Sequence, residues 1–274
     1  MTTNRLPTFF ISHGGGPWPW MRGMAQGPYA KLAASLQRMP AEAGGKPAAI
    51  LMISAHWEEP VFTVQTHPAP PMLYDYYGFP EEAYHIRYDA AGAPALAKRV
   101  TELLGAAGIA SAQDPERGYD HGMFAPMAVA YPQADMPTVQ LSLRAGLDPL
   151  AHVQLGRALA PLRDEGILLV GSGLSYHNLR NFGPRAKDAS HAFDDWLDQA
   201  AVSTLPSTAV PRTAPTSYAV SDTADAAPAF AAGTVERMRS FETVSEAPTP
   251  MPRTTKAIMR KPAEPPSPSR ASIA

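Results

Sequence analysis

The sequence predicts an α/β fold in which a mostly parallel or mixed central sheet is flanked by helices. Two observations support this fold class. Short apolar runs of strand length occur along the chain, and longer segments with apolar residues every three or four positions lie between them. Strands that alternate with helices form a sheet with both faces covered. The apolar runs are Thr8–Ile11, Ala48–Ser54, Pro137–Leu143 and Gly166–Gly171.

The helical segments follow these runs in order. Met21–Arg38 comes after the first run, and Ala93–Ala107 keeps a helical apolar pattern that stops near Gly105 and Gly108. Glycine is frequent where helices end, because it adopts the left-handed conformation without strain. The remaining predicted helices are Leu150–Glu165 and Asp188–Ala200.

The composition changes at about residue 200. The chain has 30 prolines among its 274 residues, and before this point they fall at turns between apolar segments. Residues 201–274 are rich in Pro, Ser, Thr and Ala and contain no histidine. Such a segment cannot bury enough apolar area to offset the entropy lost on ordering. We therefore expect one catalytic domain over residues 1–200 and a disordered tail over 201–274.

Charge and cysteine content exclude several classes of function. The net charge of -2 gives no electrostatic reason to expect nucleic acid or an anionic membrane as a partner. The chain has no cysteine, which rules out disulfides, thiolate ligands and a cysteine nucleophile. No apolar stretch has the length of a signal peptide or a membrane span. A cytoplasmic enzyme is expected, with imidazole or carboxylate groups holding any metal.

Three histidines occupy the same topological position. His13 and His56 each lie two residues past an apolar run, and His177 lies a few residues past another. A fourth, His121, lies in a predicted loop between helical and strand-like segments. Sites in open α/β sheets form at the carboxyl ends of the strands, so the imidazoles of His13, His56 and His177 can converge on one metal ion. The other four histidines are expected to have surface or structural roles: His67, His85, His152 and His191.

Two short motifs near these histidines receive structural interpretations. The three glycines at 14–16 lack the spacing of a nucleotide-binding loop and are expected to let the chain turn sharply after His13. Ser172 lies in a GSG sequence, but the nucleophile-elbow pattern is absent, so a serine hydrolase is not expected. Aromatic residues near the histidines either pack in the core or form a wall for a flat substrate; they are Trp18, Trp20, Trp57, Tyr74, Tyr76, Tyr77 and Phe79.

Six motifs together resemble one known family. They are PTFFISHGGGPWPW, ISAHWEEP, DYYGFPEEAYHIRYDAAGAPALA, GYDHGMFAPM, MPTVQLSL and LLVGSGLSYHNLR. In order and spacing they resemble the DOPA-dioxygenase type of class III extradiol ring-opening dioxygenases, over about residues 5–200. The resemblance implies an α/β fold, a small aromatic diol and O₂ as substrates, and a divalent metal, Fe(II) for catalysis or Zn(II) as found.

The resemblance also implies roles for the four histidines. His13 and His56 correspond to metal ligands. His177 corresponds to the catalytic base or an additional ligand, and His121 to a residue that orients substrate or oxygen. The mechanism it implies is that a catechol chelates the metal, which lowers the pKa of its hydroxyl groups. An imidazole then takes the remaining proton at neutral pH.

The C-terminal part departs from the family pattern. The family supplies a last ligand from a C-terminal histidine or glutamate before Leu-Pro, and no such motif follows His191. Our hypothesis is that the tail is an out-of-frame or otherwise replaced C-terminus, which resequencing of the gene tests. If the tail is genuine, the resemblance implies a site that lacks one ligand and binds its metal weakly.

Two alternatives to a dioxygenase stay open at this point. One is a metal-dependent hydrolase that uses the same histidines with a metal-bound water. The other is a folded remnant that binds its ligand without turnover, because the C-terminal ligand is missing. The oligomeric state is also left open by the sequence.

Overall fold

Six strands form one mixed sheet in the computed structural model, which describes residues 5–174, 177–178, 184–193 and 195. The strand order is β1-β6-β2-β5-β3-β4, and neighbours are parallel except for the antiparallel pair β3 and β5. The strands are β1 (Thr8–Ser12), β2 (Ala49–Glu59), β3 (Phe62–Gln65), β4 (Ser111–Asp114), β5 (Thr138–Arg144) and β6 (Ile167–Gly173). The predicted mixed α/β class is confirmed.

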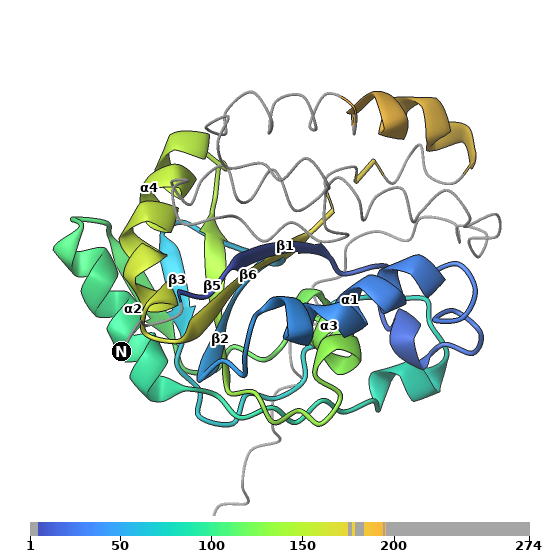
Figure 1. The fold of residues 1–274 in the computed structure, drawn as a ribbon, viewed down its shortest axis with the longest axis horizontal. Coiled ribbons are helices and arrows are strands. Elements are labelled where there is room, and N and C mark those ends of the chain that lie inside the picture. Colours follow the sequence, from blue (N-terminus) through green and yellow to red (C-terminus); the bar gives the residue numbers. More distant parts are fainter. Residues whose placement is uncertain (1–4, 175–176, 179–183, 194, 196–274) are drawn as a thin grey trace, which may run out of the picture.

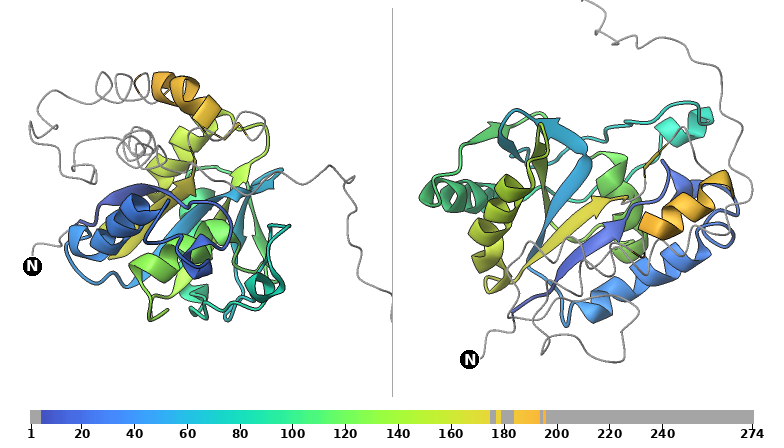
Figure 2. Two further views of the ribbon diagram at one scale, coloured as in Figure 1. Left: turned by 90° about the vertical axis from the view of Figure 1, so that its right-hand side faces the viewer. Right: turned by 90° about the horizontal axis from the view of Figure 1, so that it is seen from above.

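Helices cover both faces of this sheet (Figures 1 and 2). One apolar cluster contains residues of α1 and α3, and the other contains residues of α2 and α4. The α-helices are α1 (Ala30–Glu42), α2 (Pro94–Ala106), α3 (His121–Ala130) and α4 (Pro149–Leu159), the last continued by the 3₁₀ helix Ala160–Arg163. Among the helices that the structure describes, none has the length and apolarity that a membrane crossing requires.

Strand β2 shows how the sheet divides the core. Ile50 and Met52 belong to the cluster with α1 and α3, whereas Leu51 and Ile53 belong to the cluster with α2 and α4. All four are buried, because side chains alternate between the two faces of a strand and both faces are covered here. A continuous apolar run is the expected sequence of such a strand.

The four predicted strands are confirmed, and three elements are additional. Strands β3 and β4 are short, and α3 occupies the segment that the sequence analysis expects to be a loop. Helix α1 begins at Ala30 rather than Met21, because residues 21–29 form turns. The predicted helix Asp188–Ala200 is helical at the described positions 187–193 and 195. Residues 194 and 196–200 lie outside the described residues, as does the predicted tail over 201–274.

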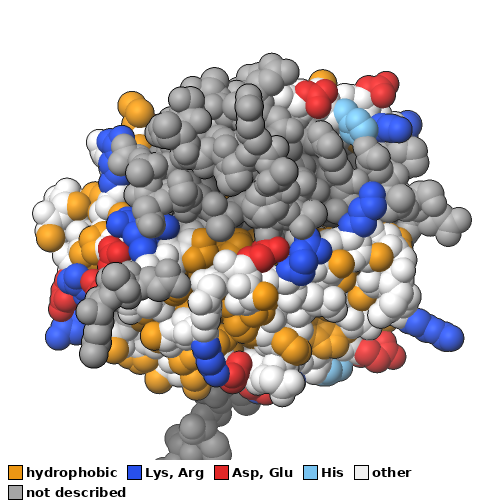
Figure 3. All heavy atoms as spheres, in the orientation of Figure 1, with side chains coloured by type: hydrophobic (Ala, Val, Ile, Leu, Met, Phe, Trp, Pro, Cys, Tyr) orange, Lys and Arg blue, Asp and Glu red, His pale blue; other side chains and the backbone are white. Residues whose placement is uncertain are grey.

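Charged side chains of both signs are interspersed on the described part of the face in Figure 3. Among the described residues several surface charges are paired, as in Lys46 with Asp135 and Arg99 with Glu165. This distribution agrees with the small net charge of -2. The described part of this face shows no stripe of basic side chains like those that bind a nucleic-acid backbone.

Candidate metal centre

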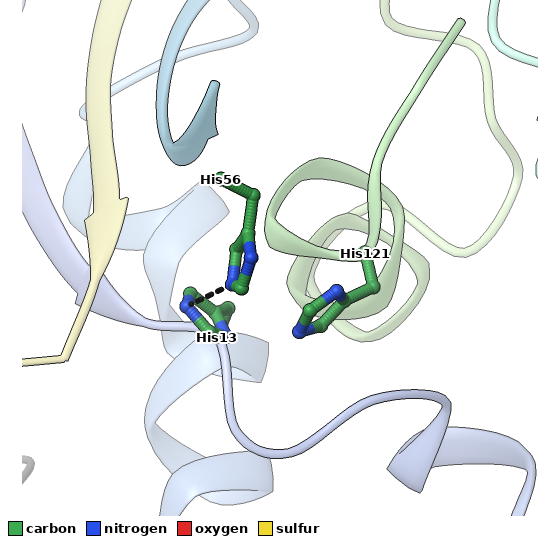
Figure 4. A group of neighbouring side chains, drawn as sticks. All are labelled: His13, His56 and His121. Atoms are coloured by element: carbon green, nitrogen blue, oxygen red, sulfur yellow. Dashed lines mark hydrogen bonds between the residues drawn. The ribbon is translucent and has the colours of Figure 1, made fainter. Parts of the chain in front are cut away.

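Three histidines from separate elements point toward one another (Figure 4). His13 follows β1 directly, His56 lies within β2, and His121 is the first residue of α3. One ring nitrogen of each lies within 4.8 Å of the others. Ring centroids are 4.7 Å apart for His13 and His56, 5.0 Å for His13 and His121, and 4.0 Å for His56 and His121.

An irregularity in β2 allows His56 to join this group. Between Ile53 and Glu58 the β2 chain advances five residues, while its partners on β5 advance only two, from Leu141 to Leu143. Extra residues of this kind bend a strand and re-aim its side chains. His56 lies in the irregular part, and its backbone N–H donates to Ser54 Oγ at 3.2 Å.

The Nδ1 atom of each imidazole already has an acceptor. His13 Nδ1 donates to the carbonyl oxygen of Gly14 at 2.7 Å. His121 Nδ1 donates to Asp75 Oδ1 at 2.7 Å, and His56 Nδ1 lies 3.3 Å from Asp75 Oδ2. Because carbonyl and carboxylate oxygens only accept, Nδ1 of His13 and Nδ1 of His121 each carry a hydrogen. In the neutral ring, Nε2 is then the atom with a free lone pair.

Two of these Nε2 atoms face each other at close range. The distance from His56 Nε2 to His13 Nε2 is 3.1 Å. Two nitrogens bound to one metal at about 2.0–2.1 Å lie about 2.9–3.4 Å apart, depending on the bond angle. Opposed lone pairs at this distance repel unless a proton or a cation lies between them. The site therefore fits a divalent metal with imidazole ligands.

The pKa values of two of these imidazoles disfavour a proton at this position. Burial lowers the pKa of His13 well below its usual 6.5, and the charges of His121 and His56 lower it further. Burial also lowers the pKa of His56, with His121 acting in the same direction, while Asp75 opposes the shift. Neutral imidazoles are the form that binds metals, so the pocket holds these ligands ready for a cation at neutral pH.

The beginning of α3 is fixed by buried hydrogen bonds from the central strands. Asp120 is the N-cap, and its Oδ1 accepts from the Met123 N–H at 3.2 Å and from Ser54 Oγ at 2.8 Å. Ser172 on β6 donates to the carbonyl oxygen of Gly122. These contacts satisfy groups that a helix terminus leaves unpaired and hold His121 in place against β2 and β6.

Gly122 allows α3 to approach β2 closely. A Cβ atom added there would lie 2.6 Å from Ser54 Oγ and 3.1 Å from His56 Cδ2. We expect Gly122→Ala to displace His56 and weaken binding of Zn²⁺ or Co²⁺ by about 10-fold or more, as disruption of supporting contacts around a metal commonly does. The measurement is a chelator-competition titration.

A matched control is Gly105→Ala on α2, where an added Cβ would meet nothing within 4 Å. Alanine is the better helix former by up to about 1 kcal/mol, so this variant should keep metal affinity and gain slightly in stability. If Gly122→Ala and Gly105→Ala bound metal equally well, the close packing of α3 on β2 at Gly122 would not be needed to position His56.

The structure brings His13, His56 and His121 together and does not bring His177 into the group. His177 is exposed, yet it is close enough to His56 for its charge to lower the pKa of that ring. His121 is the third histidine of this group, and the role that the sequence analysis gives to His177 stays a prediction. His121 also begins a helix and does not lie in a loop, which corrects the expectation for that segment.

The neighbouring glycines and tryptophans have structural roles. Gly14 and Gly16 both have positive φ, so the chain turns after His13 as the sequence predicts. Trp18 Nε1 donates to the carbonyl oxygen of His13 at 2.7 Å, and its ring is fully buried. Trp57 is also buried, with the Arg117 guanidinium 4.8 Å from its ring centroid. Ser172 donates to the Gly122 carbonyl oxygen and so supports α3.

Other aromatic side chains lie beside the histidines. The ring centroid of Tyr76 is 5.8 Å from that of His121, and Tyr76 also contacts Phe79 and Phe124. Trp20 lies against Phe124 at 5.9 Å and is 38% exposed. Tyr77, in contrast, is 90% exposed and points away from this packing.

Sequence reasoning missed two carboxylates of the site. Asp75 contacts both His56 and His121, and Asp120 anchors the helix that carries His121. For Asp120 a signal was present, because an aspartate before an apolar segment is a common N-cap. Asp75 lies in an aromatic loop with no periodic pattern, so only the folded arrangement identifies it.

Comparisons with known proteins agree with this geometry. The family described as "Catalytic LigB subunit of aromatic ring-opening dioxygenase" matches residues 7–214. The chain is 42% identical over 202 residues to a 4,5-DOPA dioxygenase extradiol of Beta vulgaris, covering 72% of this chain and 73% of the relative. It is 40% identical over 181 residues to the protein of that name from Escherichia coli K12, covering 66% and 63%.

One solved structure adds support for the fold. It is the crystal structure of an uncharacterized protein from Escherichia coli K12, with a TM-score of 0.55 and 31% sequence identity. The alignment covers 74% of this chain and 75% of that one. The matched residues, 7–214, include all four histidines of the sequence analysis, and they extend past the predicted boundary at residue 200.

Proposed function

Because this chain belongs to the family of extradiol aromatic ring-opening dioxygenases that includes the catalytic LigB subunit, we propose that it opens a catecholic ring with O₂ at a histidine-bound divalent metal. The observation that carries the proposal is the convergence of three imidazoles, each with an oxygen acceptor within 3.3 Å of its Nδ1 atom. The family favours this reaction over a metal-dependent hydrolase. A small aromatic diol and O₂ are the proposed substrates.

We assign the metal to Nε2 of His13 and His56, with His121 as the third nitrogen of the group. When bound, the metal supplies a Lewis acid that acidifies the diol, and Fe(II) additionally supplies the electrons that O₂ chemistry needs. Fe(II) is therefore the proposed catalytic metal, and Zn(II) can fill the same imidazole site without redox activity. His56 keeps 24% of its side chain exposed, which leaves the group open to a substrate on that side.

The remaining side chains act on the substrate. We propose that His177, exposed and electrostatically linked to His56, takes the proton of a diol hydroxyl. Tyr76, which lies next to His121 and packs on the buried Phe124, would hold the flat ring through aromatic contacts. The role of His177 as an additional ligand stays a prediction of the sequence analysis.

The test is ring opening by protein loaded with Fe(II) without oxygen and then mixed with catechol and air. We expect a yellow semialdehyde product and the uptake of one O₂ per ring opened. Protein loaded with Zn(II) should give neither signal and serves as the control. Binding of catechol without oxygen uptake by the Fe(II) form would contradict the proposal and favour an inactive remnant.

A further inference from the structure

We infer that Asp75 is a positioning residue that fixes the orientation and proton position of two imidazoles of the metal centre at once. The inference rests on the metal site of the proposed function and adds to it a residue that binds no metal itself. It assigns one carboxylate to two histidines that come from different elements, β2 and α3.

The two oxygens of Asp75 have separate partners. Oδ1 accepts from His121 Nδ1 at 2.7 Å and from the His121 backbone N–H at 3.0 Å. Oδ2 lies 3.3 Å from His56 Nδ1. Because a carboxylate offers only acceptors, the hydrogen bond to Oδ1 holds His121 as the tautomer with hydrogen on Nδ1. The position of Oδ2 beside His56 Nδ1 favours the same tautomer of His56. Both Nε2 lone pairs are then directed to the position that a metal would occupy.

The loop that carries Asp75 is paired with the segment that leads into α3. The Leu73 N–H donates to the Tyr119 carbonyl at 2.7 Å, and the Tyr119 N–H donates to the Pro71 carbonyl at 2.8 Å. This bridge is parallel and joins Met72 with Tyr119. Asp75 lies three residues past Met72 and His121 lies two residues past Tyr119, so the backbone pairing keeps the two residues close together.

Two tyrosines on either side of Asp75 tie the same loop to the chain that follows. Tyr74 Oη donates to the Ile86 carbonyl at 2.7 Å, and Tyr76 Oη donates to the Ala83 carbonyl at 2.5 Å. The Asp75 side chain is 18% exposed, which leaves it little freedom to turn away from the histidines. The position of the Asp75 side chain is therefore fixed before any metal binds, as a preorganised metal site requires of the residues that support its ligands.

Asparagine at this position cannot perform the same task. Its amide has one accepting oxygen and one donating nitrogen, so in either orientation one imidazole Nδ1 faces a donor. That ring has to move its hydrogen to Nε2 or rotate, and its lone pair is then lost to the metal. The variant Asp75→Asn has almost the volume of the parent side chain, which limits the change to this hydrogen-bonding pattern.

The first experiment measures Co²⁺ affinity and the visible Co²⁺ spectrum of Asp75→Asn by titration, with chelator competition. We expect affinity 10- to 100-fold below that of the parent, the usual effect of losing an outer partner of a histidine ligand, and a changed spectrum. The matched control is Asp89→Asn, because Asp89 is an exposed carboxylate that pairs only with Arg87 in the contacts that are described. Affinity and spectrum equal to those of this control would overturn the inference.

The second experiment needs no variant. Nitrogen-detected histidine NMR spectra of the metal-free parent should show hydrogen on Nδ1 for both His56 and His121. Hydrogen on Nε2 of both rings would overturn the inference, even if Asp75→Asn does not fold. Parent protein that shows these tautomers and binds Co²⁺, but fails to open catechol with Fe(II), would refute the proposed function and leave the role of Asp75 standing.

Discussion

Replacing His13 by alanine is expected to abolish ring opening and to remove the stabilisation that added metal gives. His13 is 2% exposed and its Nε2 faces His56 Nε2 at 3.1 Å, so the substitution removes one of the converging nitrogens from the centre of the group. Loss of one of three ligands should cost several kcal/mol of metal binding, which is about 10³-fold or more in affinity at 1.4 kcal/mol per tenfold.

The measurement for His13→Ala is thermal unfolding with and without Zn²⁺, together with O₂ uptake in the Fe(II) form. A metal present at 100 times its Kd stabilises a protein by about 2.7 kcal/mol, so the parent should show a clear rise in Tm that the variant lacks. His85→Ala is the control, because His85 is exposed and contacts Glu81 at the surface. If His13→Ala retained the metal-induced rise, His13 would not be a ligand.

Replacing Asp120 by alanine is expected to destabilise the whole domain by about 3–5 kcal/mol. Asp120 is fully buried, and its Oδ2 accepts from Arg117 at 2.8 Å and from Gln140 Nε2 at 2.9 Å. Without the carboxylate, the guanidinium of Arg117, only 16% exposed, has lost its ion-pair partner, and α3 has lost its N-cap. The free energy of unfolding in urea measures this effect.

The control for Asp120→Ala is a second N-cap of the same residue type. Asp148 caps α4 by accepting from the Leu150 N–H at 3.1 Å, but its side chain is 49% exposed. Asp148→Ala should therefore cost about 1 kcal/mol, the usual value for a cap at the surface. Equal losses in the two variants would show that the buried network around Asp120 adds nothing beyond capping.

Four of the six strands and three of the four α-helices were predictable because their residues follow simple burial patterns. Central strands such as β2 are buried on both faces and read as unbroken apolar runs. Helix α3 escaped prediction because eight of its ten residues are buried, so it has no polar face and no helical periodicity. Pro126 within it further weakens the helical pattern.

The sequence predicted a histidine metal site, but it did not predict which three histidines the structure brings together. His13 and His56 stood out in the sequence because each follows an apolar run. In the folded sheet, β6 lies between β1 and β2, the strands associated with these two histidines. The choice between His121 and His177 depended on where α3 begins, which Asp120, Ser54 and Ser172 decide through contacts distant in sequence. No local pattern encodes such contacts, so position after a strand favoured His177.

The most direct test of one metal ion bound by His13, His56 and His121 is X-ray absorption spectroscopy of the protein saturated with Zn²⁺ or Fe²⁺. Three imidazoles of one metal-binding group predict about three nitrogen neighbours at roughly 2.0–2.1 Å, with the outer scattering of histidine rings, and these features should weaken in His13→Ala. A spectrum with oxygen neighbours alone, unchanged by that substitution, would contradict the account.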